Sequence, residues 1–328
     1  MFIDKFKDKV CYHISDADLD GTGCTVLSKY YLTSICKTLY CFNTGQRDMT
    51  EVPQFVFDKE IDIILFTDIA PSLSFANELI KRNKIFVVVD HHLTSVELLE
   101  QCNISKENYF YTDKSCATLL LYNLFTEGIK RKDRVVQRFA TLVNTYDVWL
   151  DNTEDWEEAN YLNYLKKGVI NWARYFDSPD YEKNSDFINL ILEKFRSSKR
   201  FMFNFRENRI ISTEKQKEDK NYKKAKDNMK IRVDGQGNKY LYLEAPSGLS
   251  VISNRILKES PDVQYAVCRS TFKTAIENRS ISLRSREGFS VKDIAEKWGG
   301  GGHSAASGLS MTNEEQYKDL ISGKINLI

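Results

Sequence analysis

The sequence predicts an α/β protein in which an N-terminal domain with a parallel sheet is joined by a helical linker to a smaller C-terminal α/β domain. Over the first 150 residues, short apolar runs alternate with stretches of helical length, the pattern of strand–helix–strand units. A lysine-rich stretch interrupts this alternation, and a second alternation follows it. The composition, with 42% hydrophobic residues, 15 Gly and 5 Pro, excludes collagen-like and disordered chains, and 328 residues suffice for two domains.

The first domain is expected to span residues 1–190. Four short and mostly apolar runs predict its strands: Val10–Ile14, Thr38–Phe42, Ile61–Phe66 and Ile85–Val89. Residues 22–35, 72–82 and 94–101 are long enough for the connecting helices, and helical patterns dominate from residue 115 to 176. Mostly apolar strands that alternate with helices indicate a parallel sheet covered on both faces.

Residues 191–230 are expected to form a basic helical connector. The stretch Lys194–Arg232 holds 14 Lys or Arg against 5 Asp or Glu, whereas the whole chain carries a net charge of +1. The part from Lys215 to Lys226 contains no Gly or Pro, which favours a helix. Two interpretations remain open: a solvated helix whose apolar residues dock on one domain, or a charged rim that attracts polyanions.

The second domain is expected to span residues 231–328. Its predicted strands are Lys239–Glu244, Val263–Arg269, Thr274–Ile276 and Ser280–Arg284, with helices over residues 248–259 and 290–298. Four consecutive glycines, Gly299–Gly302, follow the second helix. We expect a close-packed loop there, in which the backbone N–H groups approach a phosphate or a base because no Cβ intervenes.

Nothing in the sequence predicts a membrane or secreted protein. No apolar run approaches the ~18 residues of a membrane span, and the N-terminus lacks the apolar stretch of a signal peptide. The seven cysteines include no C-x-x-C pair, so we expect small core residues kept reduced. These observations favour a cytoplasmic protein that does not bind membranes.

Acidic residues follow directly after three of the predicted strands. Asp16, Asp18 and Asp20 come after the first strand at alternate positions, and Asp68 comes after the third. Three carboxylates in one tight turn repel each other unless a cation balances them, although an N-cap and turn cluster is the alternative. A single strand-end Asp such as Asp68 also commonly caps the next helix. Because open α/β sheets bind ligands at the carboxyl ends of their strands, we expect these residues to meet.

The strongest signal is the triplet Asp90-His91-His92, which follows the Ile85–Val89 strand. The chain has four histidines, and two of them are adjacent here. A mixture of carboxylates and imidazole without a thiolate favours Mn or Mg over structural Zn. The sequence therefore predicts a metal centre at this edge of the sheet.

These motifs resemble the DHH phosphoesterase family, which is named for this triplet. The family's D-x-D-G motif is matched by Asp18-Leu-Asp20-Gly21, its strand-end Asp by Asp68, and its fourth Asp by Asp147 in Asn-Thr-Tyr-Asp-Val-Trp. In the C-terminal half, Ser-Leu-Arg-Ser at residues 282–285 and Gly-Gly-Gly-His-Ser-Ala-Ala-Ser-Gly at residues 300–308 look like the DHH-associated domain. The resemblance covers nearly the whole chain.

The resemblance implies a site for two Mn²⁺ ions, with Mg²⁺ as the other candidate ion. Its expected metal ligands are Asp16, Asp18, Asp20, Asp68, His91 and Asp147. Asp68 would bridge the ions, Asp20, His91 and Asp147 would hold one of them, and Asp18 would hold the other. Many short-RNA nucleases of this family carry His where Asp16 stands, so either Asp16 or His13 would complete the Asp18 site.

The resemblance also implies roles for the remaining motif residues. Asp90 would orient a histidine, and His92 would contact the phosphate or protonate the leaving oxygen. The residues expected to bind substrate are Arg284, Gly300, Gly301, Gly302, His303 and Ser307. A core position is the alternative for His303, and a flexible linker is the alternative for the glycines.

The implied activity is that of a metal-dependent phosphodiesterase that hydrolyses short oligonucleotides to nucleoside monophosphates, similar to the nanoRNases. The alternatives are a RecJ-like single-strand exonuclease, a cyclic or linear dinucleotide phosphodiesterase and, last, a non-catalytic nucleic-acid-binding module. The first two differ in the length and form of the substrate. The third would be expected to lack metal ligands that this chain retains. The expected partner is a short oligonucleotide or dinucleotide, and the sequence leaves a homodimer open.

Overall fold

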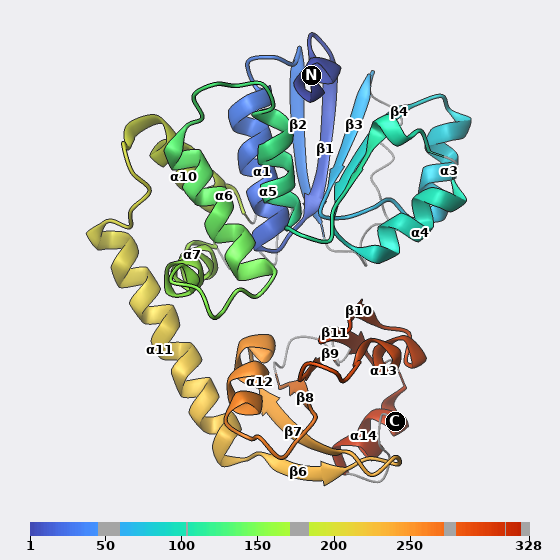
Figure 1. The fold of residues 1–328 in the computed structure, drawn as a ribbon, viewed down its shortest axis with the longest axis vertical. Helices are drawn as coiled ribbons and strands as arrows, with labels where there is room; N and C mark the ends of the chain where they lie inside the picture. The colour runs from blue at the N-terminus through green and yellow to red at the C-terminus, as the bar shows by residue number, and fades with distance from the viewer. Residues whose placement is uncertain (45–59, 103, 171–183, 272–279, 312, 323–328) are drawn as a thin grey trace. The chain divides into compact units, whose positions relative to one another are not determined.

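The computed structural model describes residues 1–44, 60–102, 104–170, 184–271, 280–311 and 313–322. The chain divides into two compact units, Met1–Ser212 and Thr213–Ile328. Each unit contains a β-sheet with helices packed on it (Figure 1). The predicted α/β class, with a parallel sheet in the first part of the chain, is therefore confirmed.

The first unit is built on a five-stranded sheet with the order β2-β1-β3-β4-β5, in which all neighbours are parallel. Its strands are β1 (Val10–Asp16), β2 (Thr38–Thr44), β3 (Ile63–Thr67), β4 (Ile85–Asp90) and β5 (Tyr109–Tyr111). Every residue of β3 and the last five of β4 are buried. This burial explains why these two strands are apolar throughout instead of alternating.

Helices cover both faces of this sheet. One face carries α3 (Leu73–Lys81) and α4 (Leu93–Gln101), and the other carries α1 (Leu19–Leu32) and α5 (Ala117–Phe125) with α6 (Arg134–Asp147), α7 (Trp156–Val169) and α10 (Ser185–Ser197) (Figure 1). Short 3₁₀ turns lie at Phe2–Phe6 and Lys106–Asn108. The larger of the two apolar cores lies between the sheet and the α1 and α5 side.

The turn from β1 into α1 sets the first acidic motif. Asp18 is the N-cap of α1, and its side chain accepts a hydrogen bond from the Gly21 N–H at 3.0 Å. Gly21 itself lies inside the helix, and a Cβ there would come within 2.2 Å of the Asp16 carbonyl oxygen. The glycine of this motif is thus required because the helix approaches the preceding loop closely.

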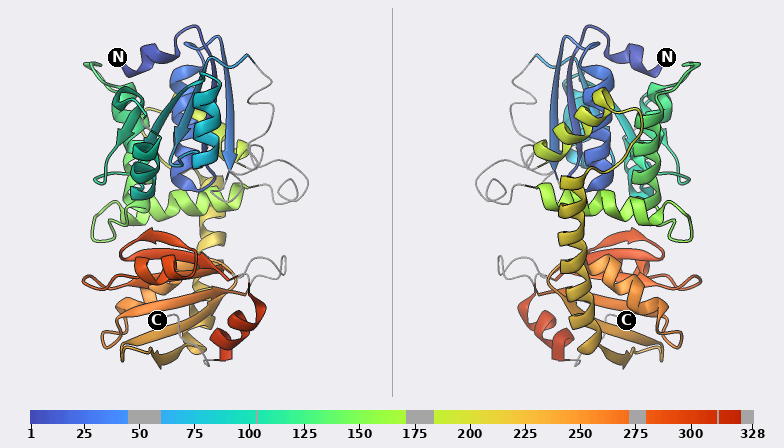
Figure 2. Two further views of the ribbon diagram at one scale, coloured as in Figure 1. Left: turned by 90° about the vertical axis from the view of Figure 1, so that its right-hand side faces the viewer. Right: turned by 90° about the vertical axis from the view of Figure 1, so that its left-hand side faces the viewer.

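A long helix, α11 (Phe205–Asp227), contains the boundary between the two units and runs without interruption (Figure 2). Asn204 and Glu207 form a reciprocal capping pair at its start: Asn204 Oδ1 accepts from the Glu207 N–H, and Glu207 Oε2 accepts from the Asn204 N–H. The same Glu207 oxygen lies 2.6 Å from Nζ of Lys194, and both side chains are buried. Near its end, the ring of Tyr222 lies under the Arg255 guanidinium.

The second unit has a six-stranded mixed sheet with the order β10-β11-β9-β8-β7-β6. Its strands are β6 (Lys230–Val233), β7 (Lys239–Ala245), β8 (Tyr265–Ser270), β9 (Ser280–Ser285), β10 (Gly301–His303) and β11 (Ala306–Ser310). The β7–β8 pair is parallel and the other pairs are antiparallel. One face packs on α12 (Leu249–Lys258), and the other packs on α13 (Lys292–Lys297) and α14 (Glu314–Ser322).

The structure corrects one local prediction. The glycine run was expected to form a loop, but Gly301 and Gly302 belong to β10, which pairs antiparallel with β11 at the edge of the sheet. The strands β5, β6 and β11 are additional to those predicted, and the predicted strand Thr274–Ile276 lies outside the described residues. Within the described ranges, no helix has both the length and the apolar character that crossing a membrane requires.

Candidate metal centre

The parallel strands bring the predicted acidic residues to one edge of the first sheet. Ser15 of β1 pairs with Thr67 of β3, and Thr67 pairs with Val89 of β4, so the three strands end at the same level. Asp16, Asp68 and Asp90 lie at or directly after these ends. Residues that are far apart in the sequence therefore converge, as expected for the carboxyl edge of an open α/β sheet.

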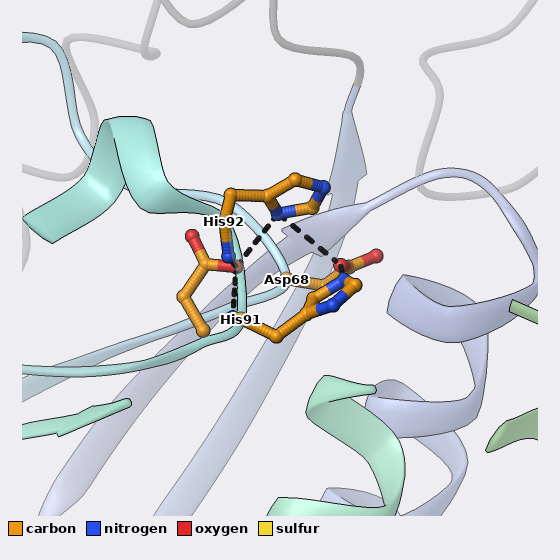
Figure 3. A group of neighbouring side chains, drawn as sticks. Asp68, His91 and His92 are labelled. Carbon is orange, nitrogen blue, oxygen red and sulfur yellow. Dashed lines mark hydrogen bonds and ion pairs between the residues drawn. The ribbon is translucent and has the colours of Figure 1, made fainter. Parts of the chain in front are cut away.

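His91 lies at the centre of this edge. Its Nε2 atom is 3.3 Å from Asp68 Oδ1, 3.4 Å from Asp147 Oδ2 and 3.8 Å from Asp20 Oδ2. The imidazoles of His91 and His92 both turn toward the Asp68 carboxylate (Figure 3). The structure thus brings together the three residues expected to hold one ion, Asp20, His91 and Asp147, and the expected bridging residue Asp68.

Asp68 is held at this position by an uncommon backbone conformation. It directly follows β3 with φ of 58°, and its N–H donates to the Val89 carbonyl of the neighbouring strand at 3.0 Å. A non-glycine residue in the left-handed region is costly, and such residues concentrate at functional sites. The strand end thus turns the buried Asp68 carboxylate toward His91.

Asp20 is fixed by a helix that begins almost a hundred residues later. Its Oδ2 accepts from the Ala117 N–H and its Oδ1 from the Thr118 N–H, both at 2.8 Å. The carboxylate therefore satisfies two of the free N–H groups at the N-terminus of α5, where negative charge is favoured. A carboxylate has about four lone-pair positions, so both oxygens retain capacity for a cation.

Asp90 is saturated by hydrogen bonds. Its Oδ1 accepts from the backbone N–H groups of His91 and His92 and lies 2.8 Å from His92 Nδ1, while its Oδ2 accepts from the Ser95 hydroxyl. Burial acts to raise the Asp90 pKa, but these bonds and the charge of His92 outweigh it and hold that pKa below its ordinary value. Asp90 in turn raises the pKa of His92 to about 9, against the lowering effect of burial. Asp90 therefore orients His92.

The carboxylates in this cluster need a counter-charge. Burial and the neighbouring carboxylates raise the pKa values of Asp68 and Asp147 well above the ordinary range. Asp147 Oδ2 is also a buried atom that has no hydrogen-bond donor in the described part of the chain. Its carboxylate lies at the end of α6, beside His91.

The donor set fits a divalent cation. Ligands on one ion with bonds of ~2.0–2.2 Å lie roughly 3–4 Å from each other, which matches the contacts of His91 Nε2. Oxygen donors with one imidazole suit Mn²⁺ or Mg²⁺. The candidate ligand atoms of Cys116, Asp20 and Asp147 lie within 4.8 Å of one another, and burial raises the pKa of the Cys116 thiol well above its ordinary value.

Asp16 and Asp18 lie at the margin of this cluster. Two groups of the described residues have ligand atoms that lie within 4.8 Å of one another within the group, and neither group includes Asp16 or Asp18. One group is Asp68, Asp90, His91 and His92, and the other is Asp20, Cys116 and Asp147. Asp16 Oδ1 accepts from the backbone N–H groups of Ala17 and Asp18. Burial, followed by the charge of Asp18, raises the Asp16 pKa to about 7.

The alternative ligand His13 lies deeper in the sheet. Its Nε2 is 2.7 Å from the Thr67 hydroxyl, which also lies 2.7 Å from the Ser15 hydroxyl. His13 is fully buried, and this burial lowers its pKa to about 3, so the ring is neutral. Its Nε2 is engaged with Thr67, whereas its Nδ1 is a buried atom with no hydrogen-bond partner in the described part of the chain, so both Asp16 and His13 stay candidates to accompany Asp18.

The predicted substrate residues lie on two strands of the second unit. Arg284 of β9 donates to the Leu283 carbonyl at 2.7 Å and to the Ser250 hydroxyl. His303 of β10 is exposed, which contradicts a core position for it. Ser307 of β11 is buried, and its hydroxyl donates to the His303 carbonyl at 2.8 Å, so it stabilises the hairpin.

The three predicted glycines of this hairpin differ in their surroundings. A Cβ on Gly300 would meet the Gly308 carbonyl oxygen at 2.2 Å, and a Cβ on Gly302, where φ is 137°, would meet the Ala306 carbonyl oxygen at 2.6 Å. Gly301 has open space on its Cβ side. Packing therefore requires Gly300 and Gly302, whereas Gly301 leaves room for a ligand.

Sequence reasoning missed two residues that contact the predicted site residues or their loop. Ser95 donates to Asp90, and it lies one helical turn into α4, where a serine is unremarkable. Lys166 of α7 donates to the Ala17 carbonyl in the acidic loop. No local signal marks Lys166 in the sequence, because it lies in a helix distant from every motif.

Comparison with known proteins supports the family resemblance. Residues 238–325 match the DHHA1 domain. Oligoribonuclease NrnB of Bacillus subtilis is 26% identical over 315 residues, which cover 92% of this chain and 73% of that protein. The resemblance to DHH phosphoesterases that carry a DHH-associated domain is thereby confirmed.

Solved structures share the fold at low sequence identity. The DHH domain of a protein assigned to a ribosomal-protein family superposes with a TM-score of 0.63 at 13% identity, over 98% of this chain and 87% of that one. RecJ of Thermus thermophilus in complex with Mn²⁺ gives a TM-score of 0.56 at 16% identity, over 98% of this chain and 52% of that one. These likenesses support the fold.

Proposed function

We propose that this chain, which carries a DHHA1 domain and resembles DHH phosphoesterases, is a metal-dependent phosphodiesterase. It hydrolyses short oligonucleotides and releases nucleoside monophosphates. The observation that carries the proposal is the position of His91 Nε2 within 3.3–3.8 Å of three carboxylates. The similar Bacillus subtilis protein is named an oligoribonuclease, which supports the choice of substrate.

In this proposal two Mn²⁺ ions, or Mg²⁺ in their place, bind at the carboxyl edge of the first sheet. Asp20, His91 and Asp147 would hold one ion, Asp18 with Asp16 would hold the other, and Asp68 would contribute to both. When bound, the ions supply an activated water nucleophile and stabilise the negative charge that develops on the phosphate. The RecJ structure with bound Mn²⁺ supports the choice of ion through its similar fold.

The protein's own groups position the reactants. Asp20 and Asp90 are fixed by hydrogen bonds from backbone N–H groups, so their positions are set before any ligand binds. His92 Nδ1 is engaged with Asp90, which leaves the role of phosphate contact or proton donor to Nε2. In the second unit, Arg284, His303 and the backbone of the glycine hairpin bind the substrate's phosphates.

The proposal is tested by measuring kcat/KM with Mn²⁺ on labelled RNA and DNA from 2-mers to 24-mers, together with cyclic dinucleotides. We expect activity on short strands, with kcat/KM level or falling beyond about five nucleotides, because the second unit offers one Arg and one glycine hairpin for terminal nucleotides. Rates that climb steadily to 24-mers would favour the RecJ-like alternative. Preferred cleavage of a cyclic dinucleotide would favour the dinucleotide phosphodiesterase alternative.

Two further predictions accompany this function. The cytoplasm remains the predicted location, and a homodimer remains open to measurement by light scattering. Loss of all hydrolysis in the presence of bound Mn²⁺ would support the non-catalytic binding module. The retained set of Asp20, Asp68, His91 and Asp147 argues against that outcome, since a binding module has no need to bury several carboxylates together.

A further inference from the structure

The acidic loop of the first unit is held by a buried lysine from α7. Lys166 is only 7% exposed, and its Nζ donates to the Ala17 carbonyl oxygen at 2.9 Å. Ala17 lies between Asp16 and Asp18, so this bond fixes the backbone that joins two expected metal ligands. Burying an ammonium group is costly unless it is compensated. A neutral donor could satisfy this carbonyl at a lower cost in desolvation free energy than a lysine does.

Other donors converge on the same carbonyl. Asn184 Nδ2 lies 3.3 Å and Thr22 Oγ1 lies 3.4 Å from the Ala17 oxygen. Together with Lys166, these groups approach the loop from α7, from the residue preceding α10 and from α1. The Lys166 bond is the shortest of the three and carries the only charged donor. The loop is thus anchored from outside its own strand and helix.

One turn earlier, the same helix contacts the residue that precedes Asp147. Asn163 is 6% exposed, and its Nδ2 donates to the Tyr146 hydroxyl at 2.7 Å. Tyr146 directly precedes Asp147, the ligand at the end of α6. Asn163 and Lys166 are three residues apart and so lie on one face of α7. This face contacts two of the segments that carry expected metal ligands, the turn before α1 and the end of α6.

The surrounding charges agree with this arrangement. Burial lowers the Lys166 pKa to about 8, while Asp18 and Asp16 act to raise it. The carboxylates of the loop that this lysine holds therefore favour its charged form. An apolar residue at position 166 would avoid the cost of burial but would leave the Ala17 carbonyl with weaker donors.

We propose that Lys166 is a positioning residue for the metal centre, holding the Ala17 carbonyl so that Asp16 and Asp18 present their carboxylates to one of the two ions. The inference rests on the proposed function, because it assumes that both ions bind. The Asn163 bond to Tyr146 holds the same helix, α7, against the end of α6, which carries Asp147.

The test is a calorimetric titration with Mn²⁺ alone, which needs no substrate. In Lys166→Met, we expect one of the two Mn²⁺ equivalents to weaken by about 10- to 100-fold, the usual effect of removing a group that orients a ligand. The other equivalent should change by less than about twofold. Lys166→Arg retains a charged donor and should keep most of the affinity, whereas a purely structural loss would not be rescued in this way.

Lys167→Met is the matched control, because it removes the adjacent lysine and leaves the Ala17 bond intact. It should leave both equivalents unchanged. Asn184→Ala removes a weaker donor to the same carbonyl and should weaken the same equivalent by a smaller factor. This variant keeps the test decisive if Lys166→Met fails to fold.

The kinetic signature should match the metal signature. With saturating Mn²⁺, Lys166→Met should lower kcat while changing the KM for a dinucleotide by less than about twofold, since the second unit is untouched. Equal weakening of both Mn²⁺ equivalents, or no weakening of either, would overturn the inference. Wild-type protein that binds two Mn²⁺ but hydrolyses no nucleotide would refute the proposed function and leave this inference standing.

Discussion

The two units hold their candidate residues in opposite ways. In the first, Asp20, Asp68, Asp90 and His91 are all at most 8% exposed and lie where parallel strands end. In the second, His303 is exposed on a short edge strand, and Arg284 is held by hydrogen bonds to neutral partners. Buried charges keep a fixed geometry and need metal ions, whereas an exposed hairpin offers contacts that form when a ligand arrives. The contrast predicts that substitutions in the first unit affect catalysis and that substitutions in the second affect substrate binding. Variants of each unit can test this separately.

The largest effect should come from the buried cluster. Asp68→Asn should reduce kcat to below about a tenth of the wild-type value and lower the Mn²⁺ stoichiometry from two to one or none, because the bridging carboxylate is lost. The fold should survive, since the substitution removes a charge from a crowded acidic site. Calorimetry, steady-state kinetics and circular dichroism check the three parts. A variant that keeps both metal equivalents would remove Asp68 from the bridging role.

Next in size should be the glycine hairpin of the second unit. Gly300→Ala and Gly302→Ala place a Cβ within 2.2 and 2.6 Å of a backbone oxygen, so each should lower the melting temperature by several degrees. Gly301→Ala should leave the melting temperature nearly unchanged and raise the KM for a dinucleotide. Thermal melts and kinetics separate the two classes. Equal melting temperatures for all three variants would show that the hairpin tolerates a Cβ throughout.

Arg284→Ala and His303→Ala should have a smaller and more selective effect. We expect KM to rise by about tenfold with kcat and Mn²⁺ stoichiometry nearly unchanged, because these groups bind substrate and do not hold metal. The measurement is a set of kcat and KM values on one dinucleotide, with parallel Mn²⁺ titrations. Loss of a metal equivalent in either variant would place that residue in the first unit's chemistry.

A separate effect should appear in the stability of the metal-free protein. Asp16 has its pKa raised to about 7 in the folded chain, above an ordinary value of 3.8. Below about pH 4 both states bind the proton, and between pH 4 and pH 7 the unfolded chain releases it first, so stability falls as pH rises through this window. Asp68 and Asp147 shift in the same direction.

Melting curves in EDTA from pH 4 to pH 8 measure this fall. Asp16→Asn should flatten the slope, and adding Mn²⁺ should reverse it in the wild type, because the ions favour the ionised carboxylates. Gly301→Ala, which changes the second unit, serves as the control and should keep the wild-type slope. A metal-free protein that gains stability between pH 4 and pH 7 would contradict the acidic crowding described above.

The sequence was sufficient to place Asp16, Asp68 and Asp90 at one edge because each follows a recognisable apolar strand, whereas Asp147 at the end of α6 came only from the family resemblance. Parallel strands end at one edge by geometry, so Asp68 and His91 could be brought together without a structure. The contacts of Asp20 with α5 and of Lys166 with Ala17 could not be predicted. They join residues far apart in the chain, and helix-helix packing decides them.

The glycine run shows a second limit of sequence reasoning. Glycine has a low intrinsic preference for strands, so four in a row favour a loop. The structure pairs Gly301 and Gly302 with β11, and the close approach of the two backbones leaves no room for a Cβ at Gly300 or Gly302. The assignment of Gly301 and Gly302 to a strand depends on the partner strand β11, which local sequence patterns do not reveal.

The double attachment of Asp20 has an evolutionary consequence. Its carboxylate satisfies the first N–H groups of α5 and also faces His91, so replacing it damages folding and metal binding together. Asp68 and Asp147 carry raised pKa values, and losing either one relieves charge repulsion. A descendant that abandoned catalysis but kept this fold should therefore discard Asp68 or Asp147 early and retain Asp20 long afterwards. The order in which such a lineage loses its carboxylates would show which of them are needed for folding.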